Sequence, residues 1–515
     1  MFIPKTNLNL FLLTRYFKEG IIMLKMLKKK IAGKSLALNS FINLSTKISL
    51  LFISLAFIGY ISRILDQTEL GIFAVLFIFY SLLGMLGGLG LNSTALRLIP
   101  ELLAKKEHTK TGDIIKITMI ASTFATLLLC LAGFGIDTYI ASIFLKSKDL
   151  AVFIDWIIVN SFFYTIFDRF ILLYQTLQQF KMLAFLNIIT NVSQRAFALI
   201  LILLGYKLHG IMLGFLLGTL LGVICGFIGM SKFLFSQYNG YSAKEYIKFS
   251  FPFYGQGIMR FMFSQADQML IAFLFNPEKL AIYFIAKKII NLITLVFEAI
   301  YDTVTPKLAE IKSKGLLVFK NNLGRVYQIL ISLVLIGVSV IFLNSKLFMF
   351  LLGGEKFTEY YYLLNVLAIS IITYTLYLLS NIGVYLYKSP KEGFALSFYV
   401  GATTVILEII FGLTFGLIGF SIAQSIGYIV GIAIVQYKYK DASINYIWRR
   451  DITFASLAAL GLITGYYINT YFLTMDNTIF LLTKTLIINI LLLVGVAAFY
   501  FKKEKMLNWD NANGT

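Results

Sequence analysis

Charged side chains interrupt the long apolar runs of this sequence, and they are the residues with the most chemistry to offer. A charge at the centre of a bilayer costs about 2.5–3.5 kcal/mol on insertion scales, so it persists where it faces water, a counter-charge or a ligand. Four acids could bind a proton or another cation, because burial disfavours an ionised carboxyl group: Asp267, Glu298, Asp302 and Glu408. Four cations could attract an anionic ligand: Lys47, Arg260, Lys287 and Lys288.

Each of these side chains also has a structural interpretation. Arg260 and Asp267 are seven residues apart, so on a helix they share a face about 10 Å apart and could form a stabilising ion pair. Long basic side chains can extend to the membrane surface, and acids near a helix end can simply be solvated. Asp168 and Arg195, on successive apolar runs, are interpreted as a structural ion pair.

No group of residues predicts an active site for covalent or metal chemistry. The few Cys and His residues do not form a cluster with metal-ligand spacing. His108 and His209 fall in expected loops or at a helix end, where neither suits the base of a membrane acyltransferase. A membrane glycosyltransferase would carry an acidic motif in its first outer loop, which here has only Asp66 and Glu69. We therefore expect no enzyme, no metal site and no cofactor.

The composition predicts an integral membrane protein. Of the 515 residues, 59% are hydrophobic and 14% are charged, and the mean hydropathy is +0.82. Soluble domains carry roughly 25% charged residues, and a single soluble core stops growing at about 250–300 residues. The net charge of +20 comes from Lys and Arg between apolar runs, which is typical of cytosolic membrane loops rather than of nucleic-acid binding.

The apolar runs predict an all-α fold of about fourteen transmembrane helices, because a helix needs about 20 apolar residues to span a bilayer. Loops rich in Lys and Arg alternate with loops poor in them, which places both termini in the cytosol and the chain in the inner (cytoplasmic) membrane. The functional start is left open between Met1 and Met23. The expected spans are 36–61, 70–95, 113–135, 151–174, 182–204, 209–231, 246–275, 280–304, 323–343, 361–386, 394–412, 416–436, 452–472 and 478–501.

Two stretches indicate an internal repeat. Residues 61–73 (ISRILDQTELGIF) align with 271–283 (IAFLFNPEKLAIY) at an offset of 210, and 97–101 (RLIPE) aligns with 306–310 (PKLAE) at an offset of 209. The units are six spans apart, so they predict two parallel six-helix lobes related by a pseudo-two-fold axis along the membrane normal, a transporter architecture. The expected segments are a basic cytosolic leader 1–35, an N-lobe 36–235, a C-lobe 245–440, two C-terminal helices within 450–501 and a cytosolic tail 502–515.

Four short motifs stand at the ends of these spans. They are Ser62–Leu65 with Glu69–Phe73, Gly88–Leu91 with Arg97 and Glu101, Pro252 with Asp267–Ile271, and Pro306. At these residues, and by topology over 36–440, the chain resembles the polysaccharide-transporter branch of the multidrug/oligosaccharidyl-lipid/polysaccharide exporter superfamily. Ser62, Asp66 and Leu70 depart from the usual two glycines and aromatic residue of the first motif. The resemblance gives a structural role to Arg63, Gly71, Gly90, Arg97, Glu101, Pro252 and Pro306.

The resemblance implies a flippase that exports a lipid-linked oligosaccharide from the cytosolic to the outer leaflet by alternating access. The four cations would then attract the phosphates of an anionic carrier lipid, and the four acids would couple transport to H⁺ or Na⁺. Polysaccharide assembly enzymes are possible partners. A multidrug or cation antiporter of the same fold and a peptidoglycan-precursor flippase stay open as alternatives. The glycan, the coupling ion and the oligomeric state are not predicted.

Overall fold

The computed structural model of the protein describes residues 34–105, 107–235, 237–238, 240–312, 315–388 and 390–440. The two predicted C-terminal spans, the predicted tail and residues 1–33 of the predicted leader lie outside these residues. The described part of the chain is helical and has no strand. Nine of its helical segments are long and apolar enough to cross a membrane. The structure thus confirms the predicted all-α membrane fold, whereas the total of fourteen helices stays a prediction.

The elements of the first half cover the six predicted spans and include three short additional ones. They are α2 (Lys34–Ile64), α3 (Gln67–Gly88), α4 (Leu91–Ala104), α5 (His108–Phe134), α6 (Asp137–Phe144), η1 (Lys148–Leu150), α7 (Ala151–Thr176), α8 (Phe180–Leu203) and α9 (Lys207–Leu234). Those of the second half are α10 (Ala243–Leu274), α11 (Pro277–Lys312), α12 (Leu316–Gly353), α13 (Glu355–Thr358), α14 (Tyr361–Tyr387), α15 (Pro390–Phe415) and α16 (Leu417–Lys438).

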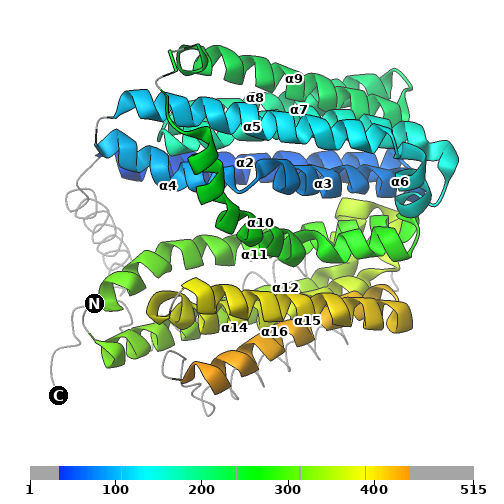
Figure 1. The fold of residues 1–515 in the computed structure, drawn as a ribbon. Helices are drawn as coiled ribbons and strands as arrows, with labels where there is room; N and C mark the ends of the chain where they lie inside the picture. Colours follow the sequence, from blue (N-terminus) through cyan, green and yellow to red (C-terminus); the bar gives the residue numbers. More distant parts are fainter. Residues whose placement is uncertain are drawn as a thin grey trace, which may run out of the picture.

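Figure 1 shows two stacked bundles, with α2–α9 in one and α11–α16 in the other. The packing of the two bundles follows the same plan. Helix α8 packs on α9 as α15 packs on α16, α7 packs on α9 as α14 packs on α16, and α5 packs on α7 as α12 packs on α14. The repeated packing supports the internal repeat that the sequence indicates, and the boundaries of the lobes remain as proposed from the sequence.

The predicted span 70–95 is not one helix. Leu89 and Gly90 have φ angles of 48° and 71°, so the chain turns there and α4 begins at Leu91. A β-carbon on Gly90 would lie 2.3 Å from the carbonyl oxygen of Ser250 in α10. Glycine therefore satisfies both the left-handed backbone and the close approach of a second helix.

Asp66 explains one departure from the family motif. Its side chain accepts a hydrogen bond from the Glu69 N–H at 2.7 Å, and Glu69 accepts one from the Asp66 N–H at 3.1 Å. This capping box satisfies two N–H groups at the start of α3 that have no partner within the helix. The acid at position 66 therefore begins the helix in place of the glycine that the family motif expects.

Helix α10 passes from one bundle to the other, as Figure 1 shows. Its first turns pack on the N-terminal half, where the Tyr246 hydroxyl lies 2.9 Å from that of Thr118. Pro252 is the tenth residue of the helix Ala243–Leu274, so it lies inside the helix and not at a helix end as interpreted from the sequence. Proline in a helix interior removes a backbone hydrogen bond and favours a bend. Pro306 likewise falls within the bounds of α11.

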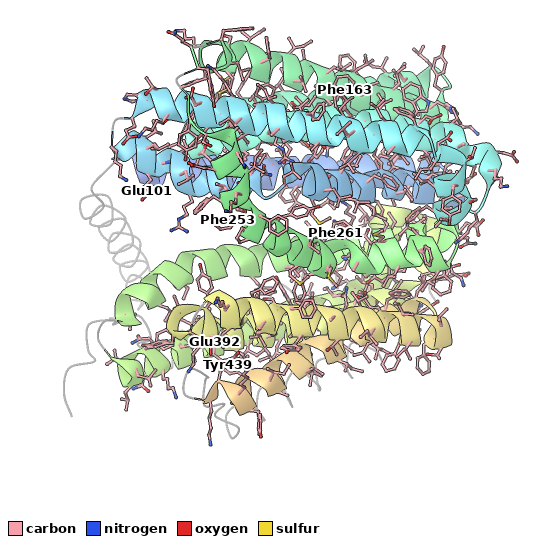
Figure 2. The ribbon with its side chains drawn as sticks, viewed as in Figure 1. Glu101, Phe163, Phe253, Phe261, Glu392 and Tyr439 are labelled. Atoms are coloured by element: carbon pink, nitrogen blue, oxygen red, sulfur yellow. The ribbon has the colours of Figure 1, made fainter. Side chains whose placement is uncertain are left out.

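The two ends of the molecule differ. We call them the Glu101 end, where Figure 2 labels Glu101, Glu392 and Tyr439, and the Asp66 end, where the α2–α3 turn lies. At the Asp66 end the two halves touch closely, since a β-carbon on Gly71 would lie 2.0 Å from the carbonyl oxygen of Pro277. The halves are therefore in backbone contact at this end.

Candidate functional site

A cavity lies between the two bundles. Its volume is about 430 Å³, and its walls come from α3, the start of α4, α7, α10 and α11. Figure 2 labels Phe253 and Phe261 on α10, and both side chains line this cavity. Gly90, Asn92 and Ser93 line it as well, so the cavity reaches from mid-helix toward the Glu101 end. The rest of the wall mixes aromatic rings with hydroxyl and amide groups.

Lys288 supplies a positive charge to the cavity wall. Its amine lies 4.7 Å from the ring centroid of Phe77 in α3 and 4.9 Å from that of Phe284 in α11. These rings come from opposite halves and attract the ammonium group through their negative faces. Arg195 adds a second positive charge near Lys288. An anion in the cavity would therefore meet an attractive potential beside Lys288.

Lys287, the preceding residue, points to a different environment. Its amine donates to both carboxylate oxygens of Asp267 in α10 and to the Ser264 carbonyl oxygen, the latter at 3.0 Å. Successive residues on a helix differ by about 100° in direction, which separates the two lysines. The positive charge of Lys287 is therefore engaged by an acid within the second half. Lys287 is not among the described residues that line the cavity.

Asp267 is the centre of a buried polar cluster, with 1% of its surface exposed. Besides Lys287, it accepts hydrogen bonds from the Tyr283 hydroxyl at 2.7 Å and from the Gln424 amide at 2.8 Å. Glu408, 2% exposed, lies beside Asp267 and Gln424, and its Oε2 has no hydrogen-bond partner in the described part of the structure. Two acids share one lysine, so the cluster holds one negative charge in excess when both are ionised.

The wall contributed by α7 is electrically balanced. Arg169 is fully buried and donates to the Gly84 carbonyl oxygen at 2.8 Å and to Asp168 at 3.2 Å. The Asp168 side chain is 44% exposed and lines the cavity. The predicted pair of Asp168 with Arg195 is wrong, because the adjacent Arg169 takes the acid and Arg195 donates to Asn191 at 2.7 and 3.0 Å.

Five other candidate residues have side chains that lie outside what the structure describes. They are Lys47, Arg260, Glu298, Asp302 and Pro306. Their backbones belong to α2, α10 and α11. The roles predicted for them stay predictions.

The motif residues in the described part lie at the contacts between the halves and at the Glu101 end. Arg63 donates to the carbonyl oxygens of Phe350 and Leu351 at 3.1 Å, which end α12 in the other half. Arg97 is exposed and lies 6.0 Å from the ring centroid of Phe249 in α10. Glu101 is exposed at the end of α4, as Figure 2 shows.

The sequence did not reveal an aromatic pair in the cavity wall. The rings of Tyr80 and Tyr164 stack with centroids 4.1 Å apart and an interplanar angle of 5°, and both line the cavity. The Tyr80 hydroxyl lies 3.4 Å from Asn160. Tyrosine is common in this sequence, with 30 residues, so no local signal marks these two. Gln424 was missed for the same reason, because an amide on an apolar helix has no motif.

Comparison with known proteins identifies the family of this chain. The sequence profile described as "Polysaccharide biosynthesis protein" matches residues 36–312, which is more than half of the chain. No curated protein matches the chain in sequence.

Three solved structures show the same fold. The structure of the lipid II flippase MurJ in an inward closed conformation has a TM-score of 0.70 at 16% sequence identity. The match covers 91% of this chain and 99% of the MurJ chain. An inward-facing multidrug resistance MATE family transporter of the MOP superfamily has a TM-score of 0.63 at 13% identity, covering 78% and 98%. A MOP superfamily transporter from Pyrococcus furiosus, whose description names a reversed polarity of its binding pocket, has a TM-score of 0.55 at 14% identity, covering 79% and 95%.

Proposed function

The chain belongs to the polysaccharide biosynthesis protein family, and from this premise we propose that it transports a lipid-linked oligosaccharide from the cytosolic to the outer leaflet. The observation that carries the proposal is the cavity between the two bundles with the Lys288 ammonium group in its wall. The Glu101 end faces the cytosol in this proposal, as the distribution of Lys and Arg predicts. The two bundles rock about the cavity, which opens to one leaflet at a time.

The composition of the cavity wall supports an anionic, sugar-bearing cargo. A carrier-lipid phosphate would sit beside Lys288, where the neighbouring cation Arg195 adds to the attraction. The tyrosine rings offer flat apolar faces, and Ser81, Asn92, Ser93 and Gln265 offer hydroxyl and amide groups to sugar hydroxyls. The lipid tail stays in the bilayer throughout. A drug or cation antiporter would instead be expected to have an acidic or neutral cavity.

The buried cluster around Asp267 supplies a means of coupling. Burying an unpaired carboxylate is costly, so the excess negative charge shared by Asp267 and Glu408 favours a bound proton or another small cation. Lys287 holds Asp267 in place, which leaves Glu408 as the acid that exchanges the cation. We propose that H⁺ or Na⁺ moving through this cluster drives the rocking of the bundles. Glu298 and Asp302 remain alternative coupling groups.

A flipping assay in vesicles of the purified protein tests the cargo. The vesicles contain a pyrophosphate-linked oligosaccharide with a fluorescent label, and the fraction protected from an added quencher measures flipping. Lys288→Met should lower the flipping rate by tenfold or more, because one charge-assisted contact contributes about 1.5–3 kcal/mol. Lys279→Met is the matched control, since Lys279 is an exposed lysine on the same helix and does not line the described cavity.

Other results would point elsewhere. Unchanged flipping by Lys288→Met, or equal flipping of a neutral glycolipid, would contradict the anionic cargo. Faster movement of a peptidoglycan-precursor lipid, or of a cationic dye, would favour the corresponding alternative. Co-purification with glycosyltransferases or a chain polymerase would identify the proposed assembly partners.

A further inference from the structure

Lys356 joins the two halves at the Asp66 end. It lies in α13, the short helix that follows α12 in the second half. Its ammonium group donates to the carbonyl oxygen of Leu65. Leu65 follows the last residue of α2, the first helix of the first half. The Gln67 amide in turn donates to the Lys356 carbonyl oxygen at 3.2 Å. This lysine therefore crosses the contact between the halves and caps a helix end on the other side.

Lys146 makes the corresponding contact in the opposite direction. It follows α6 in the first half, and its ammonium group donates to the carbonyl oxygen of Phe273 at 2.5 Å. Phe273 is in the last turn of α10, the first helix of the second half. The amine also lies 6.0 Å from the ring centroid of Phe273.

The two lysines are related by the internal repeat. Lys146 and Lys356 are 210 residues apart, which is the offset that aligns 61–73 with 271–283. The backbone agrees with this correspondence, since α5 ends at Phe134 and α12 has a break in helical geometry at Asn344, 210 residues later. Each half thus sends one lysine to the end of the first helix of the other half.

The chemistry of these two lysine–carbonyl contacts suits an interface between the halves that can separate. The last carbonyl groups of a helix have no donor within it and carry the negative end of the helix dipole, so an ammonium group stabilises them. Burial lowers the pKa of Lys146 and of Lys356, and Asp66 and Glu69 oppose this shift at Lys356. The contact between the halves therefore partly removes the Lys356 ammonium group from water, whereas the Lys146 side chain stays exposed.

The backbone at Lys146 also indicates a constraint. Its φ angle is 58°, a left-handed conformation that is strained for a residue with a β-carbon. Glycine would fit this position without strain, yet the residue there has a long cationic side chain that reaches the other half. Strain of this kind persists where the surrounding contacts hold the residue in place.

We propose that Lys146 and Lys356 form a two-point latch that keeps the cavity closed at the Asp66 end and releases when the bundles rock. The latch rests on the proposed transport cycle. Arg63 strengthens the side that carries Lys356, because it donates to the last carbonyl groups of α12. Residue 273, at the same offset from Arg63, is Phe, so a guanidinium is missing at the position equivalent to Arg63 on the side that carries Lys146. The Lys146 side is therefore the weaker of the two.

Access to the cavity from each membrane side tests the latch. The probe is Ser81→Cys, a cavity residue of α3, in a chain whose Cys130 and Cys225 are replaced by Ala. A membrane-impermeant maleimide is added to one side of the vesicles without any cargo. Lys146→Gly removes the ammonium group and suits the left-handed backbone, so it should fold. Lys148→Met, at an exposed lysine two residues away, is the matched control.

The latch predicts faster labelling from the Asp66 side by about tenfold for each lysine removed, since a charge-assisted hydrogen bond contributes a factor of about ten or more. Lys356→Met should act likewise, and Lys146→Arg or Lys356→Arg should keep labelling slow. Labelling by Lys146→Gly no faster than by Lys148→Met would overturn the latch. Because no cargo is present, that failure would leave the flipping assay untouched, and a failure of the flipping assay would leave the labelling result standing.

Discussion

Replacing Gly71 by Ala should push the two halves apart at the Asp66 end. A β-carbon on Gly71 would lie 2.0 Å from the carbonyl oxygen of Pro277, 2.4 Å from its carbonyl carbon and 2.8 Å from its α-carbon. All three are backbone atoms at the start of α11, so no flexible side chain can yield. The contact joins the two halves, and it is relieved if the halves separate there.

The magnitude follows from the cost of overpacking. Inserting one carbon into a packed contact costs about 1–3 kcal/mol. If only the conformation closed at the Asp66 end bears this cost, the equilibrium shifts toward the open conformation by about 5- to 150-fold. The labelling rate of Ser81→Cys from the Asp66 side should rise by a similar factor.

Gly84→Ala is the matched control for this substitution. Gly84 is in the same helix, and a β-carbon there would meet nothing within 4 Å. Alanine at this position should leave the labelling rate unchanged and should favour the helix by about 1 kcal/mol. Equal labelling by Gly71→Ala and Gly84→Ala, with both proteins folded, would refute the view that the backbone contact at Gly71 holds this end closed.

Three further substitutions follow from the buried groups and the helix break. Glu408→Gln should keep basal flipping but remove its dependence on an H⁺ or Na⁺ gradient, and a persisting gradient dependence would exclude Glu408 as the coupling acid. Gly90→Ala should lower the melting temperature, because Gly90 has a φ angle of 71° and is in close contact with α10. Gly416→Ala should lower it less, because Gly416 has a similar φ angle of 63° but open space around it. An equal loss for both variants would contradict the close approach of α10 to Gly90. Asp168→Asn should reduce the free energy of unfolding by about 1 kcal/mol, a value discounted because Asp168 is 44% exposed, since Arg169 loses its counter-charge; an unchanged melting temperature would contradict the pair.

The helices could be predicted well from the sequence because each one is marked by an apolar run within its own residues. Long apolar runs and the charges between them need no knowledge of packing, so twelve of the predicted spans correspond to long helices of the structure. The break at Leu89–Gly90 was missed because glycine is also common at close helix contacts in membranes. The same local signal could not distinguish a proline at a helix end from Pro252, which lies inside α10.

The candidate site was only partly predictable because it depends on direction and on distant partners. Lys287 and Lys288 are neighbours in sequence, yet the first binds Asp267 and the second lines the cavity. The partner of Asp168 is the adjacent Arg169 and not a residue on another helix, and neighbouring positions in a sequence do not indicate such a pair. Gln424 joins Asp267 from a helix more than 150 residues away, a contact with no trace in a single sequence.

The most direct measurement is a structure of the protein with a pyrophosphate-linked oligosaccharide bound. The account predicts a phosphate oxygen within about 3 Å of the Lys288 amine, the usual distance of a charge-assisted hydrogen bond. The sugars should then extend along the cavity wall beside Tyr80 and Tyr164. Cargo bound with its phosphates outside the space between the two bundles would contradict the account.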